Sequence, residues 1–573
     1  MPYEAHVYTN NHVLNSALTH ICYLVAGSHK FVLRIPNILS FIVLCFGVFK
    51  YFEYLNKVSS KIILTTLFLL TFNFLDFFEL CRGYGISLGF MLIGLAFLQD
   101  YFTKKKLVFL ILFSLCWQVA LAANLILVVA FPMLLFFIIV FQFRHRLFFN
   151  IVNLLLLAFN SKILYSWIKF SFFYKEHGSL DSGIGDDYWQ VSFKSLMLLI
   201  FGTDLPWFQV LIIVISSIII LITLFKFFKD HLSFDSLFKP QFFYFIMLIG
   251  LVLAFYLQKM YLDVNYPEDR TGLFFYLFFV LTFTFFIDSL TDRVTLPSAI
   301  TLLSASVVYF IFSFNLTYFT HWFYHITPKK IYTQLQDEYK KEQRLFTLGG
   351  FSYREMTYAF MNYRADAMLN PMDPAETMHM NCDYAFALKV EKPYYRFFYD
   401  EIGYDEKWNR VLLKRKQKIE RIEQTQLSVN AKDFKGNAEW FEGVKFNDTS
   451  IVTKSCIEAD LTINFKNVPK PFNAFLVLQV NDTADRTVYY KKIPLNWIAD
   501  DLNGKSHHFK ITSGPLPQKF GNANVHVWNI DKKDVEFTIS DLKIFELKAP
   551  GINVVVPKEY YPLIKSITKE RTL

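Results

Sequence analysis

One charged stretch follows an apolar run and could do chemistry. It reads LDFFELCRGYG and carries Asp76, Glu79, Arg82 and Tyr84. Asp76 and Glu79 are one helical turn apart, so a helix would place both carboxylates on one face, within reach of Arg82. Such carboxylates can exchange protons with a substrate, and an arginine can bind a negatively charged group of that substrate. Mutual neutralisation of the three charges is the structural alternative.

A second charged stretch lies between two phenylalanine-rich segments. It reads NYPEDRTG, residues 265–272, and carries Tyr266, Asp269 and Arg270. A loop that only joins two helices would not need three charges and a proline. Ionisable residues at membrane depth are costly and are usually functional or paired. The alternative is that Arg270 is a helix-end cation that reaches the membrane interface.

Two further polar stretches are candidates for substrate binding. The first is NNHVLNS near the start of the chain, with Asn10, Asn11 and His12. The second is the loop YKEHGSLDSGIGDDYWQ, residues 174–190. A solvated loop histidine and a flexible connector are the structural alternatives for these two stretches.

The composition indicates that these stretches lie in a membrane protein. Of 573 residues, 54% are hydrophobic and 19% are aromatic, with 66 Phe, which is far above the average of soluble proteins. The net charge is +9, but the basic residues fall mostly at the ends of apolar runs, so they indicate membrane topology and no nucleic-acid partner. The six cysteines form no CxxC pair, which excludes a zinc ribbon and leaves a Cys382–Cys456 bridge open.

The elements that must position the charged stretches are transmembrane helices. A helix needs about 20 apolar residues to cross the hydrocarbon layer. The sequence contains about ten such runs, near residues 37–56, 62–79, 84–99, 106–122, 124–142, 147–167, 206–226, 241–258, 272–288 and 297–315.

The basic residues of the short connections predict the orientation of these helices. Alternate connections hold Lys57 and Lys61, Lys104–Lys106, Arg144 and Arg146, Lys226 to Lys239, and Arg293. Placing them in the cytoplasm satisfies the positive-inside rule. The other connections, including all four polar stretches, then face outward, as does the chain beyond about residue 320. Because residues 1–36 would begin outside, we expect a further helix upstream of this chain.

The order of the motifs resembles a family of membrane enzymes. NNHVLNSALTH, VLRIPNILSF, FFELCRGYGISLGF and NYPEDRTGLFF follow one another and resemble the integral-membrane GT-C glycosyltransferases. The most similar group is the bacterial branch related to protein O-mannosyltransferases and the lipid A aminoarabinose transferase. Its Asn-His, Arg-x-Pro and Arg-x-Tyr patterns correspond to Asn11-His12, Arg34–Pro36 and Arg82–Tyr84. The resemblance spans roughly residues 8 to 320.

The resemblance implies a donor, a site and a location. The donor is a sugar carried on a polyprenyl phosphate in the bilayer, and the acceptor is a glycan, lipid or protein. The resemblance implies no organic cofactor and leaves a divalent metal open. Phosphate binding is then assigned to Arg82, Tyr84, Tyr266 and Arg270, substrate binding to Asn10, Asn11, His12 and Asp269, and catalysis to Asp76, Glu79 and Glu4. The expected location is the bacterial inner membrane, with the C-terminal domains outside the cytoplasm.

The sequence departs from the family at the catalytic base. The family carries an Asp, often an Asp-Glu pair, just after its first transmembrane helix. Here no Asp precedes Asp76, and Glu4 is the only acidic residue among residues 1–36. The chain as given would then lack the catalytic Asp.

The C-terminal half alternates helix and strand patterns and then becomes strand-rich. We expect a transmembrane catalytic domain over 1–322, a small extracytoplasmic α/β domain over 323–425, and a jelly-roll-like β-sandwich over 426–573. The leading hypothesis is a glycosyltransferase that uses polyprenyl-phosphate sugars. The alternatives are a transporter or flippase of lipid-linked sugars and a catalytically inactive, membrane-anchored glycan-binding or assembly protein.

Overall fold

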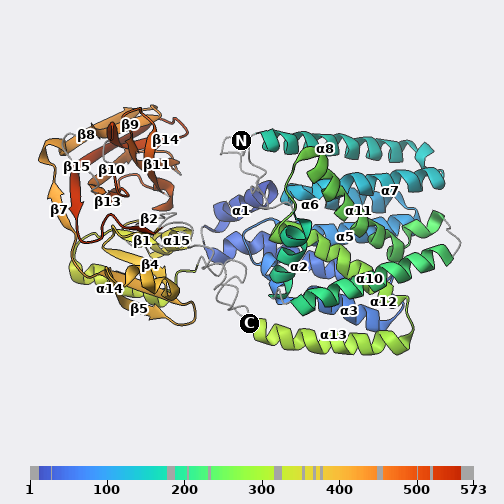
Figure 1. Cartoon of the computed structure of the whole chain (residues 1–573). Helices are drawn as coiled ribbons and strands as arrows, with labels where there is room; N and C mark the ends of the chain where they lie inside the picture. Colours follow the sequence, from blue (N-terminus) through green and yellow to red (C-terminus); the bar gives the residue numbers. More distant parts are fainter. Residues whose placement is uncertain are drawn as a thin grey trace. The chain divides into compact units, whose positions relative to one another are not determined.

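The computed structural model divides the chain into two compact units, residues 1–321 and residues 322–571 (Figure 1). It describes residues 12–27, 29–176, 187–202, 206–229, 234–314, 326–350, 355–365, 369–373, 378–447, 456–470, 472–499, 501–516 and 520–556.

The first unit is built from helices. Its elements are α1 (Val13–Ala26), α2 (Lys30–Tyr51), α3 (Val58–Leu69), α4 (Phe72–Leu75), η1 (Asp76–Phe78), α5 (Tyr84–Lys104), α6 (Leu107–Ala123), η2 (Leu125–Val129), α7 (Ala130–Arg144), η3 (Leu147–Phe149), α8 (Ile151–Glu176), the π-helix η4 (Trp189–Lys194), α9 (Ser195–Phe201), α10 (Pro206–Lys229), η5 (Phe234–Phe238), α11 (Pro240–Leu262), η6 (Asp269–Gly272), α12 (Leu273–Asp288) and α13 (Asp292–Ser313).

Within the described residues, eight helices are long and apolar enough to cross a membrane. A ninth span results if α3 and the segment Phe72–Phe78, which meet at 60°, are counted together. The sequence predicts about ten, and the run near 106–122 corresponds to α6, which is shorter than the other spans. The helices are therefore those of an integral membrane protein, with eight or nine clear spans in the part of the chain that the structure describes.

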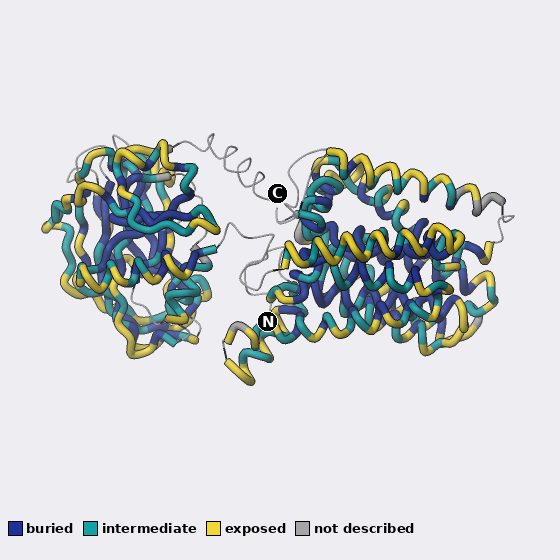
Figure 2. Tube along the Cα trace, turned by 90° about the horizontal axis from the view of Figure 1, so that it is seen from below, coloured by how far each residue is buried: buried dark blue, intermediate teal, exposed yellow. Residues whose placement is uncertain are grey.

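The burial of the spans separates inner from outer helices. Side chains of α5 and α12 are mostly buried in the unit, whereas α8, α10 and α13 bury few of theirs. Exposed residues accordingly follow the outer helices in Figure 2. Because these exposed side chains are largely apolar, they are suited to contact lipid.

The bend between α3 and α4 is supported by hydroxyl groups. The hydroxyl of Tyr276, in α12, donates to the carbonyl of Leu67 at 2.7 Å, and the Thr71 hydroxyl donates to the same carbonyl at 2.8 Å. A carbonyl near a helix break needs such partners, because lipid offers none. The bend ends in the segment that carries Asp76 and Glu79.

The basic connections predicted to share one side lie at one end of the bundle. Ion pairs join them there: Lys57 to Asp292 at 3.2 Å, Lys104 to Glu53 at 3.3 Å and Arg144 to Asp235 at 3.3 Å. The grouping predicted by the positive-inside rule therefore agrees with the packing of the helices.

The second unit is mostly strands. Its elements are α14 (Lys329–Glu342), β1 (Leu348–Gly350), α15 (Glu355–Ala365), β2 (Met372–Asp373), β3 (Met378–His379), β4 (Tyr384–Leu388), η8 (Lys389–Glu391), α16 (Lys392–Tyr395), β5 (Tyr399–Asp405), β6 (Arg410–Arg415), β7 (Glu420–Glu423), η9 (Thr425–Leu427), β8 (Val429–Gly436), β9 (Trp440–Phe446), β10 (Cys456–Asn467), β11 (Ala474–Asn481), β12 (Thr487–Pro494), η11 (Leu495–Trp497), β13 (Ser506–Thr512), β14 (Asn522–Asn529), β15 (Val535–Lys548) and β16 (Val555–Val556).

The first part of this unit is a five-stranded sheet in the order β2-β1-β4-β6-β5. On one face, Ile331 and Leu335 of α14 and Tyr358 of α15 pack against Phe386 and Leu412. The helix and strand alternation predicted from the sequence is present in this region.

Apart from β3 and β16, which pair as a two-stranded sheet, the remaining strands form two sheets that share a core. One sheet has the order β13-β10-β15-β7, with β8 also paired to β15, and the other has the order β12-β11-β14-β9. Alternate residues of β10 and β11, such as Leu461 and Leu476, enter the same core. Cys382 and Cys456 are both buried and are not joined by a disulfide, so the bridge left open by the sequence is absent.

Candidate functional site

The predicted site lies at the end of the helical unit opposite the basic connections. Glu4, Asn10 and Asn11 lie outside the described residues. The other eight predicted residues are described, and they come from the start of α1, the segment between α4 and α5, and the loop before α12.

His12 is held in one tautomer. Its Nδ1 lies 2.6 Å from the carbonyl oxygen of Ala123 at the end of α6. A carbonyl only accepts, so Nδ1 carries the proton and Nε2 presents a lone pair. Nε2 is buried and has no hydrogen-bond partner among the described residues. It is therefore an acceptor that a substrate hydroxyl could use.

Tyr84 connects His12 to the loop before α12. Its ring packs edge-on against the imidazole, with centroids 4.6 Å apart. Its hydroxyl accepts a hydrogen bond from Nε of Arg270 at 3.1 Å. Arg82 lies within electrostatic reach of both Tyr84 and His12. The structure thus brings together His12, Arg82, Tyr84 and Arg270, which come from three segments that are far apart in the sequence.

The electrostatics of this group keep His12 neutral. Burial lowers the pKa of His12 to about 4. The hydrogen bond to Ala123 opposes this shift, while the charges of Arg82 and Arg270 add to it. The site therefore concentrates positive charge around an uncharged imidazole.

Glycine makes this close approach feasible. A Cβ atom at Gly83 would lie 2.2 Å from the carbonyl oxygen of Ala123 and 2.9 Å from Cβ of His12. Both contacts are too short for any other residue without movement of the backbone. Gly83, which the sequence reasoning did not single out, is therefore required between Arg82 and Tyr84.

The NYPEDRTG loop is fixed by two serines that the sequence reasoning missed. Ser192 Oγ, in the π-helix η4, donates to the carbonyl of Pro267 at 2.6 Å. Ser195 Oγ, in α9, accepts from the backbone N–H of Asp269 at 2.8 Å. Asp269 has a φ of 50°, a left-handed conformation that is unfavourable for a non-glycine residue. These contacts hold the backbone that carries Arg270.

Tyr266 lies among aromatic rings. It is 5% exposed, and its ring lies edge-on to Tyr188 and Tyr256, with centroids 5.3 and 5.5 Å away. This aromatic cluster anchors the start of the loop. The assignment of Tyr266 to the donor phosphate stays a prediction.

The two predicted acids differ in accessibility. Asp76 is 3% exposed, in the short helix η1, whereas Glu79 follows η1 and is accessible to solvent. Partial desolvation raises the pKa of Glu79, and the charge of Arg34 opposes that shift. Arg34 belongs to the Arg34–Pro36 motif, so this motif and the acid lie close together. The predicted contact of both acids with Arg82 stays a prediction.

Metal binding finds no support in this part of the chain. Among the described residues, no group of three or more His, Cys, Asp or Glu side chains is placed to hold an ion. The arrangement can bind an anion through arginines and accept a proton or hydrogen bond at Nε2 of His12 and at Glu79.

Comparison with known proteins identifies no family. No protein-family model and no curated protein matches the sequence. One similar solved structure is that of an arabinose-bound α-L-arabinofuranosidase, with 12% identity, 22% of this chain and 23% of that chain covered, and a TM-score of 0.16. The chain thus spans less than a quarter of that enzyme, and a TM-score this low carries no argument about fold or function.

Proposed function

We propose that this protein is a GT-C-type glycosyltransferase that moves a sugar from a polyprenyl-phosphate donor to a glycan, lipid or protein acceptor. The observation that carries the proposal is the convergence of Arg82 and Arg270 on Tyr84 and His12. The site lies at the end of a helical bundle, where the phosphate of a membrane lipid would be found.

The arginines would stabilise the leaving group. When the sugar departs, negative charge develops on the donor phosphate, and fixed cations lower the energy of that transition state. Arginine suits this role because its planar fork binds phosphate oxygens bidentately and stays charged. The Tyr84 hydroxyl accepts from Nε of Arg270 and so orients the guanidinium plane.

Glu79 is the described acid that best fits a general base. A base must reach the acceptor hydroxyl, and Asp76 is almost fully buried whereas Glu79 is accessible. A raised pKa also makes the Glu79 carboxylate a stronger proton acceptor. Neutral His12 would accept a hydrogen bond from a sugar hydroxyl without repelling the arginines.

The proposed sidedness follows from the basic end of the bundle. If that end faces the cytoplasm, the site faces outward, and residues 323–425 and 426–573 form extracytoplasmic α/β and jelly-roll-like β-sandwich domains. The bacterial inner membrane is the proposed location, with the lipid bilayer and the lipid-linked donor as partners.

Substitution of Arg270 tests the proposal. Arg270→Lys should reduce transfer nearly as much as Arg270→Ala, because lysine keeps the charge but loses the fork. A hydrogen bond to a charged partner contributes roughly 1.5–3 kcal/mol, so activity should fall by about 10- to 100-fold. The assay measures sugar transfer from a polyprenyl-phosphate donor by the full chain. Arg293→Lys, at the basic end, is the matched control, and near-normal transfer by Arg270→Lys would refute the phosphate contact.

A lipid-linked sugar transporter is the second candidate. It is favoured by the 60° bend between α3 and α4, because broken helices line the substrate sites of many transporters. Proteoliposomes distinguish the two functions. A transporter moves the donor across the bilayer without an acceptor, whereas a transferase releases polyprenyl phosphate only when an acceptor is present.

A further inference from the structure

The strand-rich unit contains a cleft that the proposed transfer site does not use. Its volume is about 750 Å³, within the range of about 300–1,000 Å³ that is typical of ligand pockets. One wall comes from the end of α14 and the segment before β2, and the other from β13. Both walls belong to the same compact unit.

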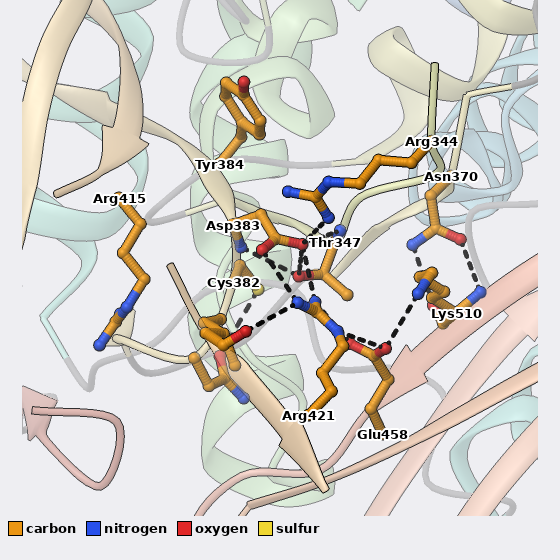
Figure 3. A network of polar contacts seen from close by, with 12 residues as sticks. Arg344, Thr347, Asn370, Cys382, Asp383, Tyr384, Arg415, Arg421, Glu458 and Lys510 are labelled. Atoms are coloured by element: carbon orange, nitrogen blue, oxygen red, sulfur yellow. Dashed lines mark hydrogen bonds and ion pairs between the residues drawn. The ribbon is translucent and has the colours of Figure 1, made fainter. Parts of the chain in front are cut away.

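The two walls are joined by a side-chain amide. Nδ2 of Asn370 donates to the carbonyl of Lys510 at 2.9 Å, and its Oδ1 accepts from the Lys510 N–H at the same distance. Asn370 is 3% exposed. These two bonds, with Asn370 facing Lys510 in Figure 3, fix the walls relative to each other, so a ligand would enter a preformed site.

An alternating series of charges lies along one side of the cleft, where the cations and Asp460 line it and Asp383 and Glu458 are buried behind them. Arg421 lies between Asp383 and Glu458, at 2.8 Å from each. Lys510 lies between Glu458 and Asp460, at 3.1 and 2.7 Å. Figure 3 shows Arg421 pointing between its two carboxylates.

Two more side chains complete the series at its ends. Arg344 lies 3.6 Å from Asp383, and His508 contacts Asp460. Arg344, Arg421 and Lys510 thus face the three carboxylates of Asp383, Glu458 and Asp460. Burial would raise the pKa of Asp460, but its contacts with His508 and Lys510 outweigh burial and hold that pKa below its ordinary range. The carboxylate therefore stays charged at neutral pH.

This balance of charges decides which ligands fit. At Arg344, Arg421 and Lys510, a phosphate or carboxylate ligand would have to displace a protein carboxylate from a cation that it already neutralises. Lys418 also lines the cleft and has no carboxylate partner among the described residues, so it could contact a ligand of either kind. A neutral ligand with many hydroxyl groups can donate to Asp460, the carboxylate that lines the cleft, and accept from the cations, leaving each ion pair intact. The rings of Tyr339 and Phe509 and the side chain of Leu369 also line the cleft and offer apolar surface to the C–H face of a sugar.

We propose that this cleft binds a neutral glycan, the sugar chain of the acceptor, through Asp460, His508 and the ion-paired residues beside them. The identification of the glycan as the acceptor rests on the proposed transferase function. Glycan binding itself does not depend on it, because the cleft shares no residue with the transfer site.

Binding by the purified full chain in detergent, without donor, tests this inference. The probes are immobilised neutral oligosaccharides (glucan, mannan, xylan and arabinan fragments) and an acidic one, oligogalacturonate. His508→Ala and Asp460→Asn should weaken neutral binding about tenfold or more, because each removes a polar partner of the ligand. Asp460→Asn should also strengthen oligogalacturonate binding, since it leaves positive charge in excess. Asp433→Asn is the matched control, as Asp433 is an exposed, ion-paired residue of β8.

The outcomes separate the two proposals. Absence of binding to every neutral probe, tighter wild-type binding of oligogalacturonate, or unchanged binding by both variants would overturn the glycan site. Arg270→Ala should leave binding unchanged while it lowers transfer about 10- to 100-fold. If the wild type binds a neutral glycan but transfers no sugar, the cleft inference stands and the transferase proposal fails.

Discussion

At position 12, one hydrogen bond decides which ring nitrogen can act. The Ala123 carbonyl accepts the hydrogen bond from Nδ1–H, so the Nε2 lone pair is left among two arginines and a tyrosine. An imidazolium in this position would add a third positive charge, and burial prevents it. His12 is thus suited to accept a hydrogen bond and poorly suited to bind an anion.

The substitution His12→Asn tests the roles of the two ring nitrogens separately. The amide Nδ2 of asparagine can still donate to the Ala123 carbonyl, but the acceptor at Nε2 is lost. We expect the thermal midpoint to stay near that of the wild type, and kcat/KM to fall about tenfold. His12→Ala should lower both. If His12→Asn transferred sugar normally, Nε2 would have no part in the reaction.

The pH profile gives a second readout of the same residue. Because His12 is neutral above its pKa of about 4, Nε2 can accept a hydrogen bond at pH 5 and above. Protonation removes this acceptor only at lower pH. The acid limb that His12 contributes to kcat/KM should therefore centre near pH 4 and not near the ordinary value of about 6.5. His12→Asn should lack that limb.

The sequence predicted part of this site for a physical reason. The positive-inside rule and the order of the motifs placed His12, Arg82, Tyr84 and Arg270 on one face, and the structure groups them. Ser192 was not predicted, because a short hydroxyl side chain in an apolar run usually bonds to its own helix. The ring environment of Tyr266 was also missed, since tyrosine suits both an aromatic cluster and a phosphate.

At the scale of elements, the π-helix η4 and α9 act as the support for the NYPEDRTG loop. Ser192 and Ser195 both bond to that loop, one to a carbonyl and one to an N–H. π-Helical turns are rare and occur frequently at functional sites. The position of the Arg270 side chain therefore depends on η4 and α9, two helical segments that carry no catalytic residue.

Ser195→Ala tests this support. The variant leaves the Asp269 N–H without its acceptor, while the left-handed backbone of Asp269 stays unfavourable. We expect kcat/KM to fall about 3- to 10-fold through misplacement of Arg270, with faster hydrogen exchange over residues 263–272. Ser298→Ala is the control, since the Ser298 hydroxyl bonds only within α13. Unchanged exchange and activity in Ser195→Ala would show that the loop holds its own shape.

The elements themselves were largely predictable from hydrophobic periodicity. Each of the ten apolar runs overlaps a helix or the bent pair, because twenty apolar residues in lipid have few alternatives to a helix. The bend at residues 70–71 was not predicted, since it depends on Tyr276, which is distant in sequence. The alternation is weakest in β7 and β8, where polar residues interrupt it.

At the scale of the whole molecule, charge is distributed between the two ends of the helical unit. The basic connections form ion pairs at one end, and the candidate site lies at the other. The sequence alone allowed this separation to be predicted, because topology depends on the count of basic residues in short loops. The distances between the acids and the arginines of the site depend on tertiary packing. A count of basic residues in loops carries no information about that packing.

Labelling of single cysteines tests the sidedness of the molecule. Cys81 is an exposed free thiol beside Arg82, Lys105 is exposed at the basic end, and Lys435 on β8 has a side chain that is 81% exposed. Lys105→Cys and Lys435→Cys are each made in a Cys81→Ser background. A membrane-impermeant maleimide should label Cys81 and Lys435→Cys in intact spheroplasts, and Lys105→Cys only after lysis. The Cys81→Ser protein alone controls for the remaining cysteines, which are half-buried or buried. Labelling of Lys105→Cys before lysis would invert the topology and place the site on the cytoplasmic face, where an outward-facing lipid-linked donor could not reach it.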